Sequence, residues 1–308
     1  MNPKPDAMKF QSGVTLMELL VTLVIGLFTM ATLVQAYVNT KHHQAITLHT
    51  NHQEQDANYA LQLIAKDIRR AGYLGELLSD TAISGSLSPS LPSKLCNKNM
   101  SWGSMLQQPL LGFNDTLTHH VQYDYSACIS SRHYLRGDVI TLRYLSPDTI
   151  SFSELKDKTN KRKVYMRTSS TEGLLFQAKD YKTNMLPIIA RSQVRRVLSH
   201  TYFIGPSNTP SDTACNNTNK TPALFRLRLN NKGLPQREEL LQGIENIQFL
   251  YSIDSNQDGI IDKTQQADHI LNWKDVVLVQ INITMYQPCM INKNNSYSTL
   301  VALKNRRG

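Results

Sequence analysis

The sequence predicts an α+β fold, with one long N-terminal helix packed on an antiparallel, β-rich domain. Three observations support this prediction. Residues 19–38 carry no charge, neither glycine nor proline interrupts residues 27–71, and several later stretches alternate apolar and polar side chains. Runs of strands after a single helix indicate an antiparallel sheet that packs on that helix.

The uncharged stretch 19–38 is long enough to cross a membrane, which takes roughly 20 residues of helix. A secretory signal peptide would be shorter and would end at a small-x-small cleavage site, and neither feature is present. Lys4 and Lys9 precede the stretch. We therefore expect the N-terminus to stay in the cytoplasm and the rest of the chain to be exported.

The same helix is expected to continue beyond the membrane as an amphipathic rod. Apolar residues recur there at steps of three and four, as they do on one helix face: Leu61, Ile64, Ala65, Ile68 and Ala71. Arg69 and Arg70, followed by Gly72, form a helix stop signal. We predict one helix over residues 14–71, about 85 Å long at 1.5 Å per residue, whose Leu61, Ile64 and Ile68 fill the interface with the sheet.

The rest of the chain is predicted to be mainly strands. Alternating or apolar stretches indicate strands at residues 138–145, 163–167, 194–204, 223–229, 244–251, 276–286 and 298–303. Residues 79–110 and 205–222 are rich in Ser, Pro, Asn and Thr and are predicted to be irregular loops. With 308 residues, the chain is long enough for one or two domains with a real core.

The cysteines favour an exported domain. The absence of a C-x-x-C pair argues against a zinc ribbon or thioredoxin-type site, and the even number fits two disulfides if the domain lies outside the cytoplasm. Four cysteines allow three pairings. Among these we favour Cys96–Cys128 and Cys215–Cys289.

One stretch matches the first nine positions of an EF-hand-type calcium loop. Oxygen ligands would come from Asp254, Asn256, Asp258, Asp262 and the Ile260 carbonyl, and Gly259 would supply the sharp turn. The twelfth position is Gln265 instead of the usual glutamate, and Asp268 has the wrong spacing to replace it. Calcium binding and a plain Asp-Gly turn between strands both remain open.

Other polar groups carry weaker signals. The net charge of +9 and the basic run 156–163 could contact nucleic acid or anionic lipid, but the run contains no aromatic side chain for base stacking and is expected to be a solvated hairpin tip. Six histidines stand in pairs that lack further metal ligands, and we expect them to be solvated: His42, His43, His49, His52, His119 and His120. The chain has no G-x-S-x-G, P-loop, H-E-x-x-H or dinucleotide motif, so nothing supports an enzyme, although scattered catalytic residues leave a membrane-anchored enzyme open.

Glu18 is a carboxylate about one turn inside the apolar stretch, where a charge is costly. The run Gly13-Val14-Thr15-Leu16-Met17-Glu18, after a short basic leader, resembles the type IV prepilin signature. The resemblance implies cleavage between Gly13 and Val14 by a prepilin peptidase and methylation of the new Val14 amine. It also implies that Glu18 pairs with the N-terminal amine of a neighbour in a fibre. Many family members have phenylalanine where this chain has Val14.

Further stretches are similar to the PilW family of type IV pilus minor pilins. These are residues 61–75, 136–145, 240–259 and 273–286, with weaker similarity at 80–120 and 147–220. The resemblance implies a pilin-like fold and a role in priming pilus assembly, without catalysis and without a certain cofactor. The partners implied are the prepilin peptidase, other major and minor pilins, the inner-membrane assembly platform and membrane lipid.

The predicted organisation follows from these assignments. Residues 1–13 are the leader, 14–38 the transmembrane and assembly half of the helix, 39–72 its amphipathic half, and 73–308 the exported domain. We expect a single-pass protein of the bacterial inner membrane, with a periplasmic domain, that later enters a pilus. A type II secretion pseudopilin and a DNA-uptake component that binds DNA through its basic surface are the alternatives.

Overall fold

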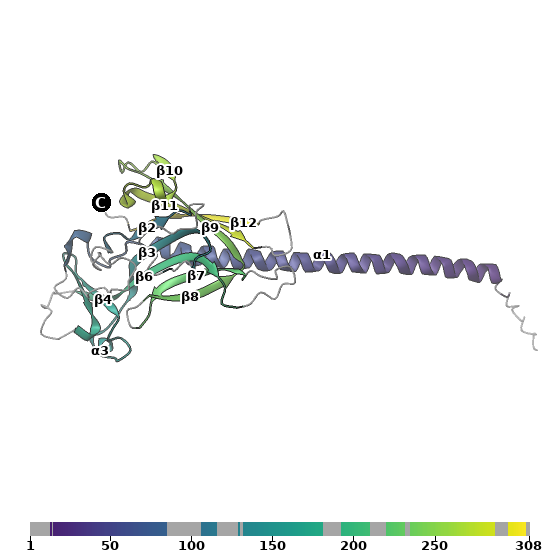
Figure 1. The fold of residues 1–308 in the computed structure, drawn as a ribbon, viewed down its shortest axis with the longest axis horizontal. Helices are drawn as coiled ribbons and strands as arrows, with labels where there is room; N and C mark the ends of the chain where they lie inside the picture. Colours follow the sequence, from purple (N-terminus) through teal and green to yellow (C-terminus); the bar gives the residue numbers. More distant parts are fainter. Residues whose placement is uncertain are drawn as a thin grey trace, which may run out of the picture. The chain divides into compact units, whose positions relative to one another are not determined.

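The computed structural model describes residues 13, 15–84, 106–115, 129, 132–180, 192–209, 220–231, 235–286 and 295–305 (Figure 1). The chain divides into two compact units, Met1–His52 and Gln53–Gly308. The division falls within the first helix, and each unit is described by itself.

The long N-terminal helix is present, as predicted. Helix α1 extends over Leu16–Arg70 and includes the uncharged stretch, the glycine-free middle and the apolar stripe. Its first turn is closed by the Thr15 carbonyl, which accepts from the amide of Glu18 at 3.0 Å. At the other end Gly72 has φ of +77°, the left-handed geometry that commonly follows a helix, so the predicted stop signal is confirmed.

The larger sheet belongs to the second unit and has eight strands. They are β1 (Ile83–Ser84), β2 (Leu110–Phe113), β3 (Arg136–Thr149), β4 (Val164–Thr168), β5 (Gly173–Gln177), β6 (Gln193–Pro206), β7 (Pro222–Leu229) and β8 (Pro235–Gln242). The spatial order is β1-β5-β4-β6-β3-β2, and β7 pairs with the second half of β6 and carries β8 on its far side. Every pair is antiparallel except β1–β5, which is parallel.

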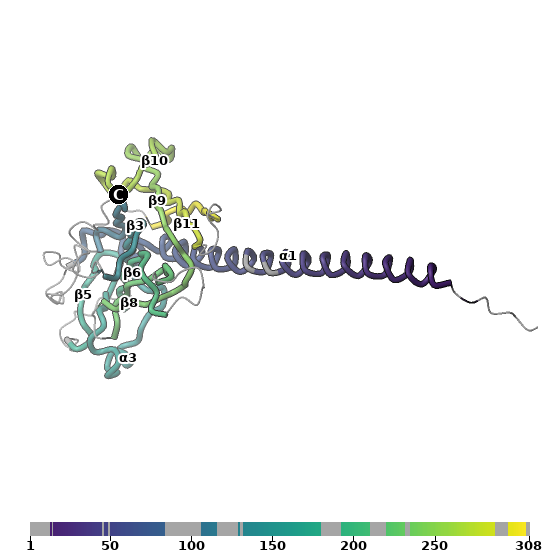
Figure 2. Tube along the Cα trace, turned by 45° about the vertical axis from the view of Figure 1, so that its right-hand side comes forward, coloured from purple at the N-terminus to yellow at the C-terminus, as the bar shows by residue number. Residues whose placement is uncertain are grey.

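A smaller antiparallel sheet has the order β10-β9-β11-β12. Its strands are β9 (Ile244–Ile253), β10 (Lys263–Gln265), β11 (Val276–Met285) and β12 (Ser296–Ala302). Figure 2 shows β9 and β11 side by side, as Figure 1 does. Short helical turns join the strands of the second unit: η1 (Asp80–Ala82), α3 (Phe152–Leu155), η2 (Ala178–Asp180), η3 (Ala267–His269) and η4 (Trp273–Asp275).

The main core of the second unit lies between the end of α1 and the inner faces of both sheets. Leu61, Ile64 and Ile68 of the predicted stripe are buried there against strand residues such as Tyr202 and Phe249, which confirms the predicted interface. Burying a leucine or isoleucine side chain fully contributes roughly 1.5–3 kcal/mol. This stripe therefore anchors the last turns of α1 to the sheets.

The structure differs from the sequence prediction in three places. The segment 79–110, predicted to be an irregular loop, begins with η1 and β1 and ends at the start of β2. Strands β5, β8 and β10 were not predicted. The basic run 156–163 forms turns between α3 and β4 rather than the tip of a hairpin, because β6 separates β3 from β4 in the sheet.

Candidate functional site

The cleavage and assembly residues predicted from the prepilin-like signature lie at the start of α1. Glu18 stands in the first turn, its side chain is exposed, and its amide also donates to the Thr15 hydroxyl at 3.3 Å. Gly13 is exposed and precedes the helix. Val14, the predicted methylation site, lies outside the described residues.

The first unit presents an apolar helix surface. Large hydrophobic side chains from Leu16 to Val38 are between 50% and 79% exposed, and no described residue of the first unit is buried. By length and composition this helix could cross a membrane. An apolar surface all round a helix requires lipid or other apolar helices as its neighbours.

Three of the six predicted histidines can be placed in the described part of the chain. His42 and His43 are exposed with their rings 6.3 Å apart, and His52 is exposed as well. The side chain of His49 and both His119 and His120 lie outside the described residues. Among the part of the chain that the structure describes, no three His, Cys, Asp or Glu side chains are grouped closely enough to hold a metal ion.

The predicted calcium loop connects β9 to β10 and is held by its own backbone. The buried Asp254 accepts from the Gly259 amide at 3.1 Å, Asp258 accepts from the Ile260 amide at 2.7 Å, and Asp262 accepts from the Ser255 amide at 2.7 Å. Gly259 has φ of +87°, a left-handed backbone conformation that favours glycine and suits the predicted turn. The oxygen donors are of the type that Ca²⁺ prefers, but their carboxylates do not converge in this structure.

The remaining predicted sites are placed as follows. All four cysteines, Cys96, Cys128, Cys215 and Cys289, lie outside the described residues. The basic run 156–163 is mostly exposed, as expected for solvated lysines.

A buried polar cluster that the sequence did not reveal joins α1 to the large sheet. The carboxylate of Asp67 accepts from the hydroxyls of Tyr144 and Tyr202 at 2.6 Å each and lies 2.6 Å from His200 Nδ1. Burial acts to raise the pKa of Asp67, but the bonds and charge of His200 and the two hydroxyls together hold it below its ordinary value. The only signal in the sequence was an acidic residue placed beside the apolar stripe of α1.

Three arginines meet at a polar cavity of about 340 Å³ on the large sheet. Arg226 and Arg228 of β7 both bond to Glu238 of β8, at 3.0 and 2.8 Å. Burial lowers the pKa of the Arg196 guanidinium, and so does the nearby charge of Arg228. The described lining residues offer one carboxylate for three guanidinium groups, so the cavity has an excess of positive charge.

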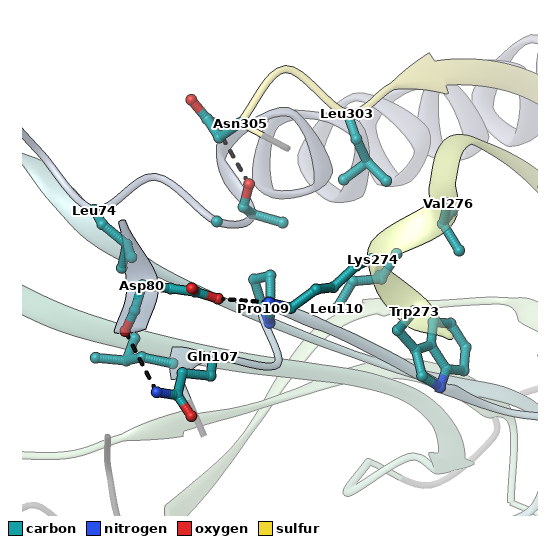
Figure 3. Close-up of a pocket in the computed structure, with 13 residues that line it drawn as sticks. Leu74, Asp80, Gln107, Pro109, Leu110, Trp273, Lys274, Val276, Leu303 and Asn305 are labelled. Carbon is teal, nitrogen blue, oxygen red and sulfur yellow. Dashed lines mark hydrogen bonds and ion pairs between the residues drawn. The ribbon is translucent and has the colours of Figure 1, made fainter. Parts of the chain in front are cut away.

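A second, largely apolar cavity lies where the chain leaves α1 (Figure 3). Lys274 of η4 reaches across it to Asp80 at 3.1 Å, and Asn305 bonds to the Arg69 carbonyl at the helix end. Its volume of about 40 Å³ has room only for a few water molecules. Both polar contacts join distant segments of the chain, so the cavity is a structural junction.

The comparison with protein families identifies one match. Residues 201–305 match the family model of type IV pilus-assembly protein W, PilW. No curated protein and no solved structure matches the chain. The match runs from the middle of β6 to the segment after β12 and includes the predicted blocks 240–259 and 273–286. It thereby confirms the resemblance to PilW over residues 201–305 and supports a PilW-family pilus component.

Proposed function

We propose that the protein is a minor pilin that primes assembly of a type IV pilus and has no catalytic role. The observation that carries the proposal is the exposed apolar half of α1, in a chain whose C-terminal third matches a pilus-assembly family. An exposed apolar helix serves first as a membrane anchor and then as a packing element in a helical bundle.

Maturation would follow the prepilin pathway. The peptidase cuts between Gly13 and Val14, and the new Val14 amine is methylated. Glu18 lies in the first turn of α1, where its carboxylate can meet the amine of a neighbouring subunit. In a low-dielectric bundle such a pair roughly offsets its own desolvation cost, so it selects the register of the helices more than it stabilises them.

The proposed orientation places the N-terminus in the cytoplasm and the second unit in the periplasm, because Lys4 and Lys9 precede the apolar stretch. Two disulfides among the four cysteines would suit that compartment. The proposed partners are the peptidase, other major and minor pilins, the inner-membrane assembly platform and the surrounding lipid.

Mass spectrometry of the N-terminus tests the maturation step. Protein from cells with the prepilin peptidase should begin at a methylated Val14, and protein from cells without it should retain residues 1–13. A chain that keeps its leader in normal cells contradicts the proposal. Deleting the gene and counting surface pili tests the assembly role, and pilus numbers equal to wild type contradict it.

A DNA-uptake role is the second candidate, favoured by the arginine-lined cavity and the net charge of +9. It requires duplex DNA binding that weakens steeply with salt, since each neutralised phosphate releases counterions. A type II secretion pseudopilin is the third, and the match to a pilus-assembly family argues for the pilus instead.

A further inference from the structure

The outer face of the β9–β11–β12 layer lacks charged side chains. The register of the strands places one set of residues on the inner, buried face and the alternate set outside. The outer set is Asn246, Gln248, Leu250, Leu278, Gln280, Asn282, Thr284, Ser296, Ser298, Leu300 and Ala302. Ser252 has the same register but is buried beside β10, where its hydroxyl lies 2.9 Å from that of Thr264. The chain has 33 basic and 24 acidic residues, yet none of them belongs to this set.

Polar groups on this face bond largely to one another. Gln280 donates to Asn282 at 3.0 Å, Gln248 donates to Asn246 at 3.4 Å, and the hydroxyls of Thr284 and Ser296 are 3.4 Å apart. Leu300 is 58% exposed in the middle of β12. The lack of charged side chains on this face is a property that it shares with the core of protein–protein interfaces, and Leu300 adds an exposed apolar side chain to it.

Among the described strands, only β11 pairs with β12, so the other edge of β12 has no strand partner in this part of the chain. The Leu303 amide donates to the Val277 carbonyl, and the Met285 amide donates to the Asn295 carbonyl. These bonds fix the phase of the β11–β12 ladder, that is, which residues of β12 have their amides turned toward β11. In that phase the amides of Tyr297, Thr299 and Val301 face β11, so those of Ser298 and Leu300 face outward. No described residue outside β11 bonds to the backbone of β12.

The other long edge of the second unit is protected, and β12 is not. Strand β8 begins with Pro235 and carries Arg237, Glu238 and Glu239, which discourage pairing with another chain. Strand β12 has the sequence SYSTLVA, with neither proline nor charge over its seven residues. An open, uncharged edge of this length is a template for strand addition.

We propose that β12 is an assembly edge, to which a different pilus subunit adds an extended strand with uncharged side chains on the outer face. This inference rests on the proposed function. The occupant is a strand because only a strand satisfies the outward N–H and C=O groups of Ser298 and Leu300. It is uncharged on that face because a charge would lose its hydration there without gaining a counter-charge.

A second copy of this chain does not fit the edge by two-fold pairing. Asn295 bonds to Gln53 and Asn305 bonds to the Arg69 carbonyl, so β12 and the end of α1 run in the same direction. Antiparallel pairing of two β12 strands would therefore set two α1 ends in opposite directions. Subunits that enter from one membrane have parallel helices, so the partner strand comes from another subunit.

Two substitutions test the edge in cells that carry the full chain. Ser298→Pro removes an outward N–H without removing a bond to β11, and Ser298→Lys adds a charge to the face. Each should lower the number of pili per cell about tenfold, the effect of losing roughly 1.4 kcal/mol of subunit affinity. Gln236→Lys, the same charge change on the protected strand β8, should leave the number unchanged.

The controls distinguish a folding defect from failure of the proposed function and from loss of strand pairing at β12. Thermal unfolding of the purified full-length variants shows whether they fold. If Ser298→Pro does not fold, the pilus count of Ser298→Lys is the test of the edge. Loss of pili on gene deletion together with wild-type numbers for a folded Ser298→Lys variant overturns the inference and leaves the proposed function intact.

A photo-crosslinking amino acid at Leu300 identifies the occupant independently of pilus counts. The expected product joins position 300 to an uncharged strand of another pilus subunit, and peptide mass spectrometry identifies that strand. The same crosslinking amino acid at position 236 of β8 should give no such product. A product with a second copy of this chain, or no product at all, overturns the inference.

Discussion

At the scale of single residues, Asp67 ties the end of α1 to the large sheet. Asp67→Asn keeps the size of the side chain but loses its charge and can no longer accept from both tyrosines and His200. We expect the free energy of unfolding to fall by about 3 kcal/mol, as for a broken buried charged network. Urea unfolding measures the loss, and the exposed Asp148→Asn is the matched control, with an expected change within about 0.5 kcal/mol.

Asp138 gives the stability a pH dependence of unusual sign for a carboxylate. Burial raises the pKa of Asp138 to about 6, even though it accepts from the amides of Phe249 and Asp115. Between about pH 4 and 6, Asp138 is protonated in the folded state and ionised in the unfolded state. The stabilisation that this proton provides is therefore complete below about pH 4 and is lost as the pH rises through about 6. The free energy of unfolding changes by roughly 2–3 kcal/mol over this pH range.

Asp138→Asn should remove that slope. Unfolding by urea at several values between pH 4 and 7 should show wild-type stability falling relative to the variant as the pH rises. The Asp67 carboxylate, whose pKa is lowered, acts in the opposite direction only at lower pH, where its protonation removes stability. Parallel pH profiles for wild type and Asp138→Asn would show that Asp138 does not titrate in this window.

Glu18→Ala tests the proposed pairing with a neighbour's amine. The variant should insert into the membrane as well as wild type, because removing a charge from an apolar helix favours insertion. Its incorporation into pili should fall, since the partner amine then remains uncompensated in low dielectric. Immunoblots of the membrane and sheared-pilus fractions measure the two steps, and normal incorporation of the variant rules out the pairing.

At the scale of elements, the periodicity of apolar residues in the sequence predicted the helix and strands that have a strongly apolar face and missed the other strands. Strand β11 alternates strictly because its inner face meets α1 while its outer face stays polar, and it was predicted almost to its ends. Strand β8 reads PQREELLQ and owes its place to pairing with β7 and to ion pairs from Glu238, which no local pattern reveals. Asp67 was missed for the same reason, since its partners are more than 70 residues away.

The loop between β9 and β10 is the element whose calcium binding we propose to test. Binding an ion with the carboxylates of Asp254, Asp258 and Asp262 would require release of their bonds to backbone amides. If calcium binds, a concentration of 100 times Kd adds about 2.7 kcal/mol to the free energy of unfolding. Asp258→Ala should abolish the calcium-dependent rise in melting temperature, and the exposed Asp148→Ala should not. A titration without heat, and without a thermal shift for wild type, rejects the site.

At the scale of the whole molecule, the two units make different demands on their surroundings. The first unit is apolar and exposed over residues 16–38, whereas the second unit, which begins at Gln53, has its own core that includes the last turns of α1. The full chain should therefore require membrane or detergent. A chain that begins at Gln53 should be a soluble folded monomer, as judged by gel filtration and a cooperative melting transition.

Whether the shortened chain folds should depend on the residue at which it begins. A chain that begins at Ala71 would lose Leu61, Ile64 and Ile68 from the core and would leave Tyr144, Tyr202 and His200 without the Asp67 carboxylate. Each large apolar deletion costs about 2–5 kcal/mol, so the loss of all three is comparable to the total of about 5–15 kcal/mol that stabilises a typical domain. The shorter chain should therefore fail to fold while the chain from Gln53 folds. Equal stability of the two chains would show that the domain does not need the end of α1, contrary to the burial of its apolar stripe in the core.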